Sequence, residues 1–230
     1  GEYCLPEDTR VLAACNRIQD RAGSHRLITP LLNRFIHFDL EVSVEDWITW
    51  AIANGIIPDI RAYLNYRPGN LIKFDPNSGE RAFPTPRSWA FLSSVFPTTP
   101  IHLHRHVAAG SIGEGVAAEF IGFAKIYREL PPLEPILENP KKAAIPKEPS
   151  VLFALAGAIS ERTKTLVCTC KTHDCESCQK LGNIMTYALR MPNEFSVLVV
   201  KDCAAANGAI LDTSEAGTWI KKHRNVLLSS

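Results

Sequence analysis

The chain has 230 residues, of which 46% are hydrophobic and 21% are charged, and its formal net charge at pH 7 is +1. This composition is typical of a soluble globular protein that buries one large core or two modest ones. The balanced charge argues against a dedicated nucleic-acid-binding protein, because neutralising phosphates takes a clear excess of Lys and Arg on some surface. No apolar run approaches the roughly 20 residues that cross a bilayer, so the sequence predicts neither a nucleic-acid nor a membrane partner.

The first expected elements are two strands. The short apolar segment from Arg10 to Cys15 is typical of a central strand in a covered parallel sheet. Residues Phe35 to Val42 alternate in character, which predicts a second strand. Between the two lies a polar segment, then a single helical turn introduced by Pro30. Residues 1–43 are therefore expected to be a fragment of an α/β domain.

The next region is predicted to be all-helical. Helix-capping residues and apolar spacing predict four helices, at Ser43 to Asn54, at Pro58 to Tyr66, from Thr85 onward, and at about Ile112 to Arg128. The first of them carries acidic residues in its first turn, as the positive end of a helix favours. We expect residues 44–130 to form one helical domain.

The remaining residues fall into two regions. Residues 131–149 are rich in proline and charge, which predicts a linker or an extended arm laid over a surface. Residues 150–230 are expected to form a mixed α/β region, with a helix at Val151 to Ile159, a helix through Arg190, a strand at Phe195 to Val200 and a helix around Ala216 to Val226. The predicted fold class of the whole chain is therefore α/β, with an all-helical domain in the middle.

Three side chains have the chemistry that ATP hydrolysis needs. That reaction positions a water in line with the γ-phosphate and neutralises charge that spreads onto the phosphate oxygens. Asn16 follows the first apolar strand, where an amide can orient a water without competing as a base. Arg34 precedes the second strand. Arg87 lies in the first turn of a helix, where its guanidinium and the positive end of the helix attract the same anion.

Each of these signals is weak alone, but their order and spacing are specific. With them the chain resembles the MoxR-type AAA+ ATPases, over roughly residues 1–128 and more loosely beyond. The matching segments are Gly1-Glu2-Tyr3 with Leu5-Pro6, Val11 to Arg17, Asp20-Arg21, Leu32 to Phe35, and Pro84 to Trp89. The resemblance implies a partial AAA+ α/β core in residues 1–43, followed by a helical lid in residues 44–130.

The resemblance also implies roles and partners. Asn16 would be the sensor-1 residue beside the γ-phosphate, Arg34 the arginine finger that reaches the neighbouring subunit's nucleotide, and Arg87 the sensor-2 residue of the lid. ATP and Mg²⁺ would be the cofactors. The protein would form a homo-oligomer, usually a hexameric ring, and would act with a von Willebrand A-domain protein.

The chain departs from this family because it lacks the phosphate-binding and Mg²⁺-binding motifs. No G-x-x-x-x-G-K-[ST] motif occurs in it, and no acidic pair follows an apolar strand to hold Mg²⁺. Because the chain also opens on Gly1, we expect it to be the downstream part of a longer ATPase that couples ATP hydrolysis to remodelling or maturation of a protein partner. Alone it is expected to be inactive. The alternative is a non-catalytic AAA-like interaction or scaffold module, which needs no phosphate loop.

The cysteines predict a compartment. The chain has seven of them, four lying between residues 168 and 178, and nothing in it resembles a signal peptide. An odd, clustered set suits a reducing compartment better than a disulfide framework, so the prediction is cytoplasmic.

The same cluster offers a metal site. Its soft ligands are Cys168, Cys170, His173, Cys175 and Cys178, and zinc takes four such ligands. A single short hairpin would have to supply all of them, so reduced cysteines at the start of a helix are the favoured interpretation. A redox role for Cys175 and Cys178 ranks lower, because no βαβ unit surrounds them. If zinc bound, the C-terminal region would be a small zinc-binding adaptor.

A further set of metal ligands is His102, His104 and His106, which would share one face of a strand. Their neighbours favour an exposed connector over a metal site.

Overall fold

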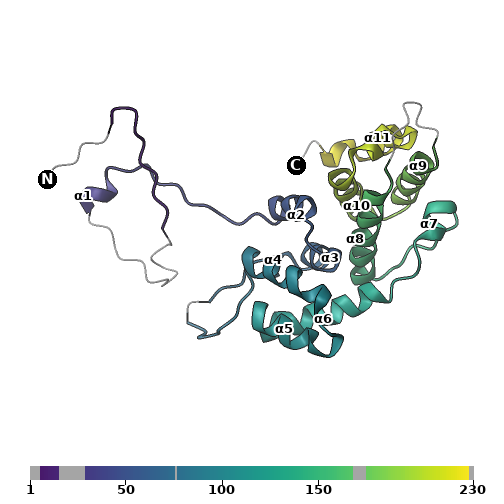
Figure 1. Ribbon diagram of the computed structural model, residues 1–230. Coiled ribbons are helices and arrows are strands. Elements are labelled where there is room, and N and C mark those ends of the chain that lie inside the picture. The colour runs from purple at the N-terminus through teal and green to yellow at the C-terminus, as the bar shows by residue number, and fades with distance from the viewer. Residues whose placement is uncertain (1–5, 16–28, 76, 168–174, 228–230) are drawn as a thin grey trace. The chain divides into compact units, whose positions relative to one another are not determined.

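The computed structural model describes residues 6–15, 29–75, 77–167 and 175–227, and the chain divides into two units. The first unit comprises Gly1–Glu41 with Asp75–Gly79, and the second comprises Val42–Phe74 with Glu80–Ser230. The described residues form α-helices, short 3-10 helices and irregular segments, with no β-strand among them (Figure 1). The predicted α/β fold is therefore wrong for the described residues, and so is the partial AAA+ α/β core.

The first unit shows why the strand predictions failed. Its described helix is the single turn α1 (Thr29–Leu32), while Arg10 to Cys15 and most of Phe35 to Val42 are irregular and exposed. Within the described residues no backbone hydrogen bond pairs these two segments. Three apolar side chains of the second segment are between 83% and 93% exposed, namely Ile36, Phe38 and Leu40. Alternation tells which side chains share a face, but a strand also needs a partner for its N–H and C=O groups.

The second unit begins with five helices around an aromatic core. They are α2 (Val44–Ala53), α3 (Pro58–Tyr66), α4 (Pro86–Val95), α5 (His104–Ile112) and α6 (Glu114–Arg128), with 3-10 turns η2 (Pro68–Asn70), η3 (Phe96–Thr98) and η4 (Ile101–Leu103). The rings of Tyr63, Trp89 and Phe120 are fully buried, and their centroids lie 5.4–5.6 Å apart. Tilted and edge-on aromatic contacts of this kind add to the stabilisation from burial. The four helices predicted here are present, and α5 is an additional one.

Local sequence fixes the start of α2. The Ser43 hydroxyl accepts a hydrogen bond from the backbone N–H of Asp46 at 3.2 Å, so the predicted N-cap is confirmed. The helix buries one face, made of Trp47, Ile48, Ala51 and Ile52, which recur at helical spacing. The prediction of this helix succeeded because the N-cap residue and the apolar face lie within ten residues of each other.

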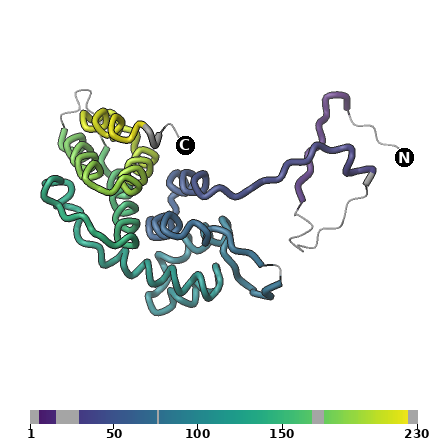
Figure 2. Tube along the Cα trace, turned by 180° about the vertical axis from the view of Figure 1, so that it is seen from behind, coloured from purple at the N-terminus to yellow at the C-terminus, as the bar shows by residue number. Residues whose placement is uncertain are grey.

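The remaining helices form a second core around α8 (Pro149–Thr165). The others are α7 (Glu134–Glu138), α9 (Glu176–Ala188), α10 (Asn193–Ala206), the 3-10 turn η5 (Gly208–Asp212) and α11 (Ser214–Leu227). Helix α8 packs against α3 and α6 of the first core and against α10 of the second. The same connection is visible from behind in Figure 2, where the α8 segment joins the teal helices to the green and yellow ones. Because α8 contributes to both cores, the second unit is held together through this helix.

The proline-rich residues 131–149 include α7 and lie against the second core. The Tyr187 hydroxyl donates to the carbonyl of Ala144 at 2.7 Å, and the Arg190 guanidinium donates to the carbonyl of Ala143 at 2.9 Å. Both donors come from the end of α9 and the turn that follows it. This segment is therefore attached to the second core by side chains that lie more than 40 residues further along the chain.

The strand predicted at Phe195 to Val200 is wrong, because these residues lie in the middle of α10. The buried residues of α10 recur at helical spacing, as Phe195, Ser196, Val199, Val200, Asp202 and Cys203. A run of six mostly apolar residues does not by itself distinguish a strand from a buried helix. The described part of residues 150–230 is all-helical, so the mixed α/β prediction for this region is also corrected.

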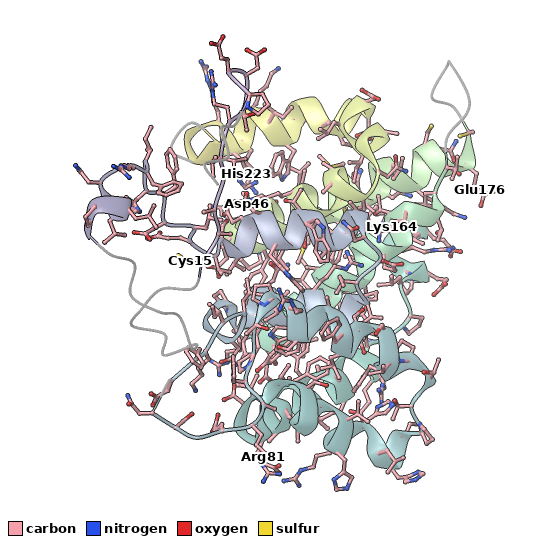
Figure 3. The ribbon with its side chains drawn as sticks, turned by 60° about the vertical axis from the view of Figure 1, so that its left-hand side comes forward. Cys15, Asp46, Arg81, Lys164, Glu176 and His223 are labelled. Atoms are coloured by element: carbon pink, nitrogen blue, oxygen red, sulfur yellow. The ribbon has the colours of Figure 1, made fainter. Side chains whose placement is uncertain are left out.

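Polar side chains connect the two cores between α3 and α8. Arg61 is only 3% exposed; its Nε donates to the carbonyl of Ile56 at 2.9 Å and its Nη2 to Glu161 at 2.6 Å. Lys164, labelled in Figure 3, lies 3.3 Å from the same carboxylate and donates to the carbonyl of Ile52. A buried guanidinium that loses its carboxylate partner is strongly destabilising, so Glu161 holds the cores together mainly by satisfying Arg61.

Asp202 is a second buried charge between the cores. It lies on α10 and is 6% exposed, and its carboxylate accepts a hydrogen bond from Asn65 Nδ2 of α3 at 3.0 Å. Burial raises the pKa of Asp202 to about 6, against the opposing effect of the nearby Arg61. The unfolded chain releases this proton near the ordinary value of 3.8, so the ionised form is penalised only in the folded state.

Asp202→Asn is expected to raise the free energy of unfolding at pH 7 by about 1–3 kcal/mol. The pKa of Asp202 is higher in the folded state than in the unfolded state. The contribution of Asp202 to the stability of the wild-type protein is therefore greatest below the unfolded pKa of 3.8, and it is lost as the pH rises through the folded pKa of about 6. The amide still accepts from Asn65 and carries no charge. Urea unfolding of both proteins should therefore show a difference that grows between pH 4 and pH 7. A difference that does not change with pH would contradict the assignment.

Candidate functional site

Arg87 lies in the first turn of α4, and a capping box fixes where that helix begins. The Thr85 hydroxyl accepts from the backbone N–H of Ser88 at 3.0 Å, and the Ser88 hydroxyl accepts from the backbone N–H of Thr85 at 2.8 Å. Pro86 occupies the first helical position, where its missing N–H costs nothing. The predicted helix start is confirmed. The Arg87 side chain is exposed, and no hydrogen bond or ion pair engages it among the described residues.

A buried polar network anchors the first turn of α4. Trp89 is fully buried, and its indole N–H donates to the carbonyl of Asn70 at 2.8 Å. Asn70 Nδ2 donates to the Tyr63 hydroxyl at 2.7 Å, and that hydroxyl donates to Glu119 at 3.3 Å. Burial raises the pKa of Tyr63 well above its usual value, so the phenol remains a donor. The position of Arg87 is therefore set by the capping box and by the buried Trp89, and not by contacts of its own side chain.

A shallow surface hollow of about 450 Å³ lies beside this network. It is lined by Tyr66, Arg67, Pro68, Gly69, Asn70 and Glu119. The Arg67 guanidinium lies over the Tyr66 ring, 4.7 Å from its centroid, as a cation–π pair. This hollow could not be predicted from the sequence, because residues 66–70, from the end of α3 through η2, meet Glu119 of α6, about 50 residues further along the chain.

A close backbone contact holds the segment that leads to α4. Gly113, between α5 and α6, has φ +83°, and a Cβ atom added to it would lie 2.8 Å from the carbonyl oxygen of Ala82. No side chain fits there without moving the backbone of Ala82, five residues before Arg87. Only glycine adopts this conformation readily.

Gly113→Ala is expected to lower the free energy of unfolding by about 1–3 kcal/mol, through positive-φ strain and the clash with Ala82. Gly110→Ala is the matched control, since a Cβ at this position in α5 meets nothing within 4 Å. It is expected to raise stability by about 0.5–1 kcal/mol, because alanine loses less conformational entropy in a helix. Equal effects of the two substitutions in denaturant unfolding would show that the close contact is not important.

The other two predicted ATP-site residues belong to the first unit. Arg34 follows α1; its side chain is exposed, and its backbone N–H donates to the carbonyl of Leu31 at 3.1 Å. Asn16 lies outside the described residues. Arg34 belongs to the first unit and Arg87 to the second, so this set of ATP-site residues stays a prediction.

The cysteine cluster is described only in part. Cys168, Cys170 and His173 lie outside the described residues. Cys175 is the N-cap residue of α9 and Cys178 is in its first turn, and the Cys175 thiol donates to the Cys178 sulfur at 3.4 Å. Within the described ranges, no three His, Cys, Asp or Glu side chains gather as a metal site would require. The predicted zinc site therefore stays a prediction.

The three histidines do not share a strand face. His102 lies in η4, while His104 and His106 lie in α5, so the strand face that a three-histidine metal site would use is not formed. His104 is buried: its Nε2 donates to the carbonyl of Thr99 at 2.8 Å, and its Nδ1 accepts from Arg128 at 2.9 Å. With both ring nitrogens engaged, His104 is a structural residue of the first core.

The structure also contains a serine–histidine pair that the sequence did not indicate. Ser196 Oγ lies 3.3 Å from His223 Nε2, and the Trp219 indole donates to the same hydroxyl at 2.8 Å. The exposed fractions of Ser196 and His223 are 0% and 2%. Because no substrate can reach a hydroxyl buried in this way, the pair joins α10 to α11 and is not a catalytic dyad.

Comparisons of this chain with protein-family models, with curated proteins and with solved structures find no match. Among the described helices none has the length and apolar character needed to span a membrane. Of the ATP-site residues predicted from the sequence, Arg87 is the one that the structure places in the first turn of a capped helix.

Proposed function

We propose that this chain supplies the nucleotide-sensing residues and the helical lid of a MoxR-like ATPase. Arg87 supports the proposal best: an exposed guanidinium, not engaged by the described residues, lies on the first turn of a capped helix. A helix N-terminus and an arginine together attract phosphate oxygens. The proposal rests on the lid and the sensors, and it does not include an α/β core in the described residues.

The residues of this chain fit the γ-phosphate end of ATP. Arg87 would bind γ-phosphate oxygens from the lid, and Arg34 would reach the nucleotide of a neighbouring subunit. Asn16 would orient the attacking water. ATP itself supplies the bond that is broken. The chain holds no motif for the other phosphates or for Mg²⁺, so the proposal places those groups outside these residues.

The assembly proposed with this function is a homo-oligomeric ring of six subunits, located in the cytoplasm, with a von Willebrand A-domain protein as its partner. In a ring, Arg34 can serve the neighbouring site while Arg87 serves the site of its own subunit. ATP hydrolysis would then be coupled to remodelling or maturation of a protein partner.

The experiment that tests the proposal uses the protein as its own cell produces it. The intact mass and the rate of ATP hydrolysis are measured on the same purified sample. A mass well above 25.4 kDa together with ATP turnover is the expected result. A mass equal to that of this chain, without turnover, would overturn the proposal.

The second candidate function is a non-catalytic interaction or scaffold module. The missing phosphate-loop motif favours it, because a scaffold does not need one. It predicts a protein of the mass of this chain that neither binds nor hydrolyses ATP. The same two measurements therefore separate the candidates.

A further inference from the structure

Cys175 and Cys178 have the spacing and the contact of a dithiol pair. They lie three residues apart at the start of α9, so both side chains are on the same turn. Their sulfur atoms are 3.4 Å apart, and one thiol donates a hydrogen bond to the other. A disulfide needs sulfur atoms about 2 Å apart, which small side-chain rotations bring about from this starting position.

The two thiols differ in how easily a reagent can reach them. Cys175 is partly exposed, whereas Cys178 is 6% exposed. Glu176, labelled in Figure 3, lies between them in sequence and forms an ion pair with Lys180, the next charged residue on the same face. Cys175 is therefore the more accessible of the two sulfurs.

The other described cysteines, Cys203 and Cys15, differ from this pair in exposure or in having a neighbouring sulfur. Cys203 is completely buried, and burial raises its pKa to about 12, so it is unreactive. Cys15 is exposed, but it lies in the first unit, away in sequence from any other described cysteine. Among the described cysteines, Cys175 is the one that is partly exposed and also in contact with a second sulfur, that of Cys178.

We propose that Cys175 and Cys178 are a reversible redox pair that a low-molecular-weight disulfide oxidises to an intramolecular disulfide. This inference is independent of the proposed ATPase function. From the sequence alone a redox role ranked low, because no βαβ unit surrounds the two cysteines; the contact between their sulfur atoms supports it.

The chemistry balances in two exchange steps. The Cys175 thiolate attacks one sulfur of glutathione disulfide, which forms a mixed disulfide on Cys175 and releases one glutathione thiolate. The Cys178 thiolate then attacks the Cys175 sulfur and displaces the second glutathione. Two electrons pass from the protein to the reagent, and the two cysteine protons end on the two released thiols. Excess reduced glutathione or another dithiol reverses both steps.

The test follows one tryptic peptide. Cleavage after Lys171 and Lys180 releases residues 172–180, which contain both cysteines and no other. The full chain is exposed to glutathione disulfide, alkylated without reduction, digested and analysed by mass spectrometry. The expected product is this peptide unalkylated and lighter by two hydrogen atoms. Two alkylated cysteines, or a cross-link to the peptide of Cys168 or Cys170, would overturn the proposal.

Single substitutions assign the roles of the two sulfurs. In Cys178→Ser the second step is blocked, so glutathione should accumulate on Cys175 at a level about tenfold above wild type, since an intramolecular thiol outcompetes a free one. In Cys175→Ser the buried Cys178 should react about tenfold more slowly than Cys175 does. Cys15→Ser is the control that leaves the peptide of residues 172–180 unchanged.

Metal analysis of the same sample separates this proposal from the zinc interpretation. Protein purified without chelator is expected to contain no stoichiometric zinc, and its oxidation should proceed equally with and without added zinc. Stoichiometric zinc that protects both cysteines from alkylation would overturn the redox proposal and would favour a metal site.

Discussion

Arg34→Ala is expected to lower ATP turnover by about 1,000-fold or more in the protein as its own cell makes it, because an arginine finger contributes that much to phosphoryl transfer. In the proposed role, the guanidinium would neutralise charge that develops on the phosphate only as the bond breaks. ATP binding should therefore change little. Turnover is measured with a coupled assay, and affinity with a fluorescent ATP analogue.

The matched control for Arg34 is Arg10→Ala. Both arginines are exposed and belong to the first unit, so each variant removes one positive charge from the surface of that unit. Arg10→Ala is expected to keep wild-type turnover. If Arg34→Ala kept turnover within a few-fold of wild type, the finger assignment would be wrong.

Mixed rings give a second measurement of the same role. A finger acts on the nucleotide of a neighbouring subunit, so a wild-type subunit beside an Arg34→Ala subunit loses its activity. Turnover should therefore fall faster than the fraction of wild-type subunits in the mixture. A strictly proportional fall would mean that Arg34 acts within its own subunit or not at all.

The helix starts were predictable because their signals are local. The caps at Ser43 and Thr85 are made by residues three positions away, and the apolar faces that follow repeat within two turns. Arg87 was predicted to lie in a first turn of a helix, and it does. Sequence reasoning worked where the interacting atoms are also neighbours in the chain.

The strand predictions failed because their outcome depends on partners. The segments Arg10 to Cys15 and Phe35 to Val42 have the right alternation or apolarity, yet among the described residues no backbone hydrogen bonds join either segment to a neighbouring strand. The segment Phe195 to Val200 had an ambiguous pattern, and packing of α10 against α8 makes it helical. Side-chain pattern alone does not say which partner a backbone finds.

The polar contacts between the cores could not be predicted for a related reason. Arg61 meets a carboxylate 100 positions later, and Asn65 meets one 137 positions later. Nothing near either residue marks its partner. The contact between Cys175 and Cys178 could not be predicted for another reason. The sequence shows that the two cysteines are three residues apart, but only the structure gives the distance between their sulfur atoms.

Arg87→Ala is expected to lower both the preference for ATP over ADP and the turnover by about 10- to 100-fold. A charge-assisted hydrogen bond contributes about 1.5–3 kcal/mol, and each 1.4 kcal/mol corresponds to about a factor of ten. The change should not affect folding, because the side chain is exposed and α4 is held by Thr85, Ser88 and Trp89.

The matched control for Arg87 is Arg81→Ala, an exposed arginine in the segment that leads to the same helix (Figure 3). It removes the same charge six residues away but not from the helix end, so nucleotide preference and turnover should stay at wild-type values. Equal losses in the two variants would show that general positive charge, rather than the geometry of the α4 N-terminus, attracts the nucleotide. A loss confined to Arg87→Ala, with unchanged unfolding by urea, would support the lid's role as a sensor of the γ-phosphate.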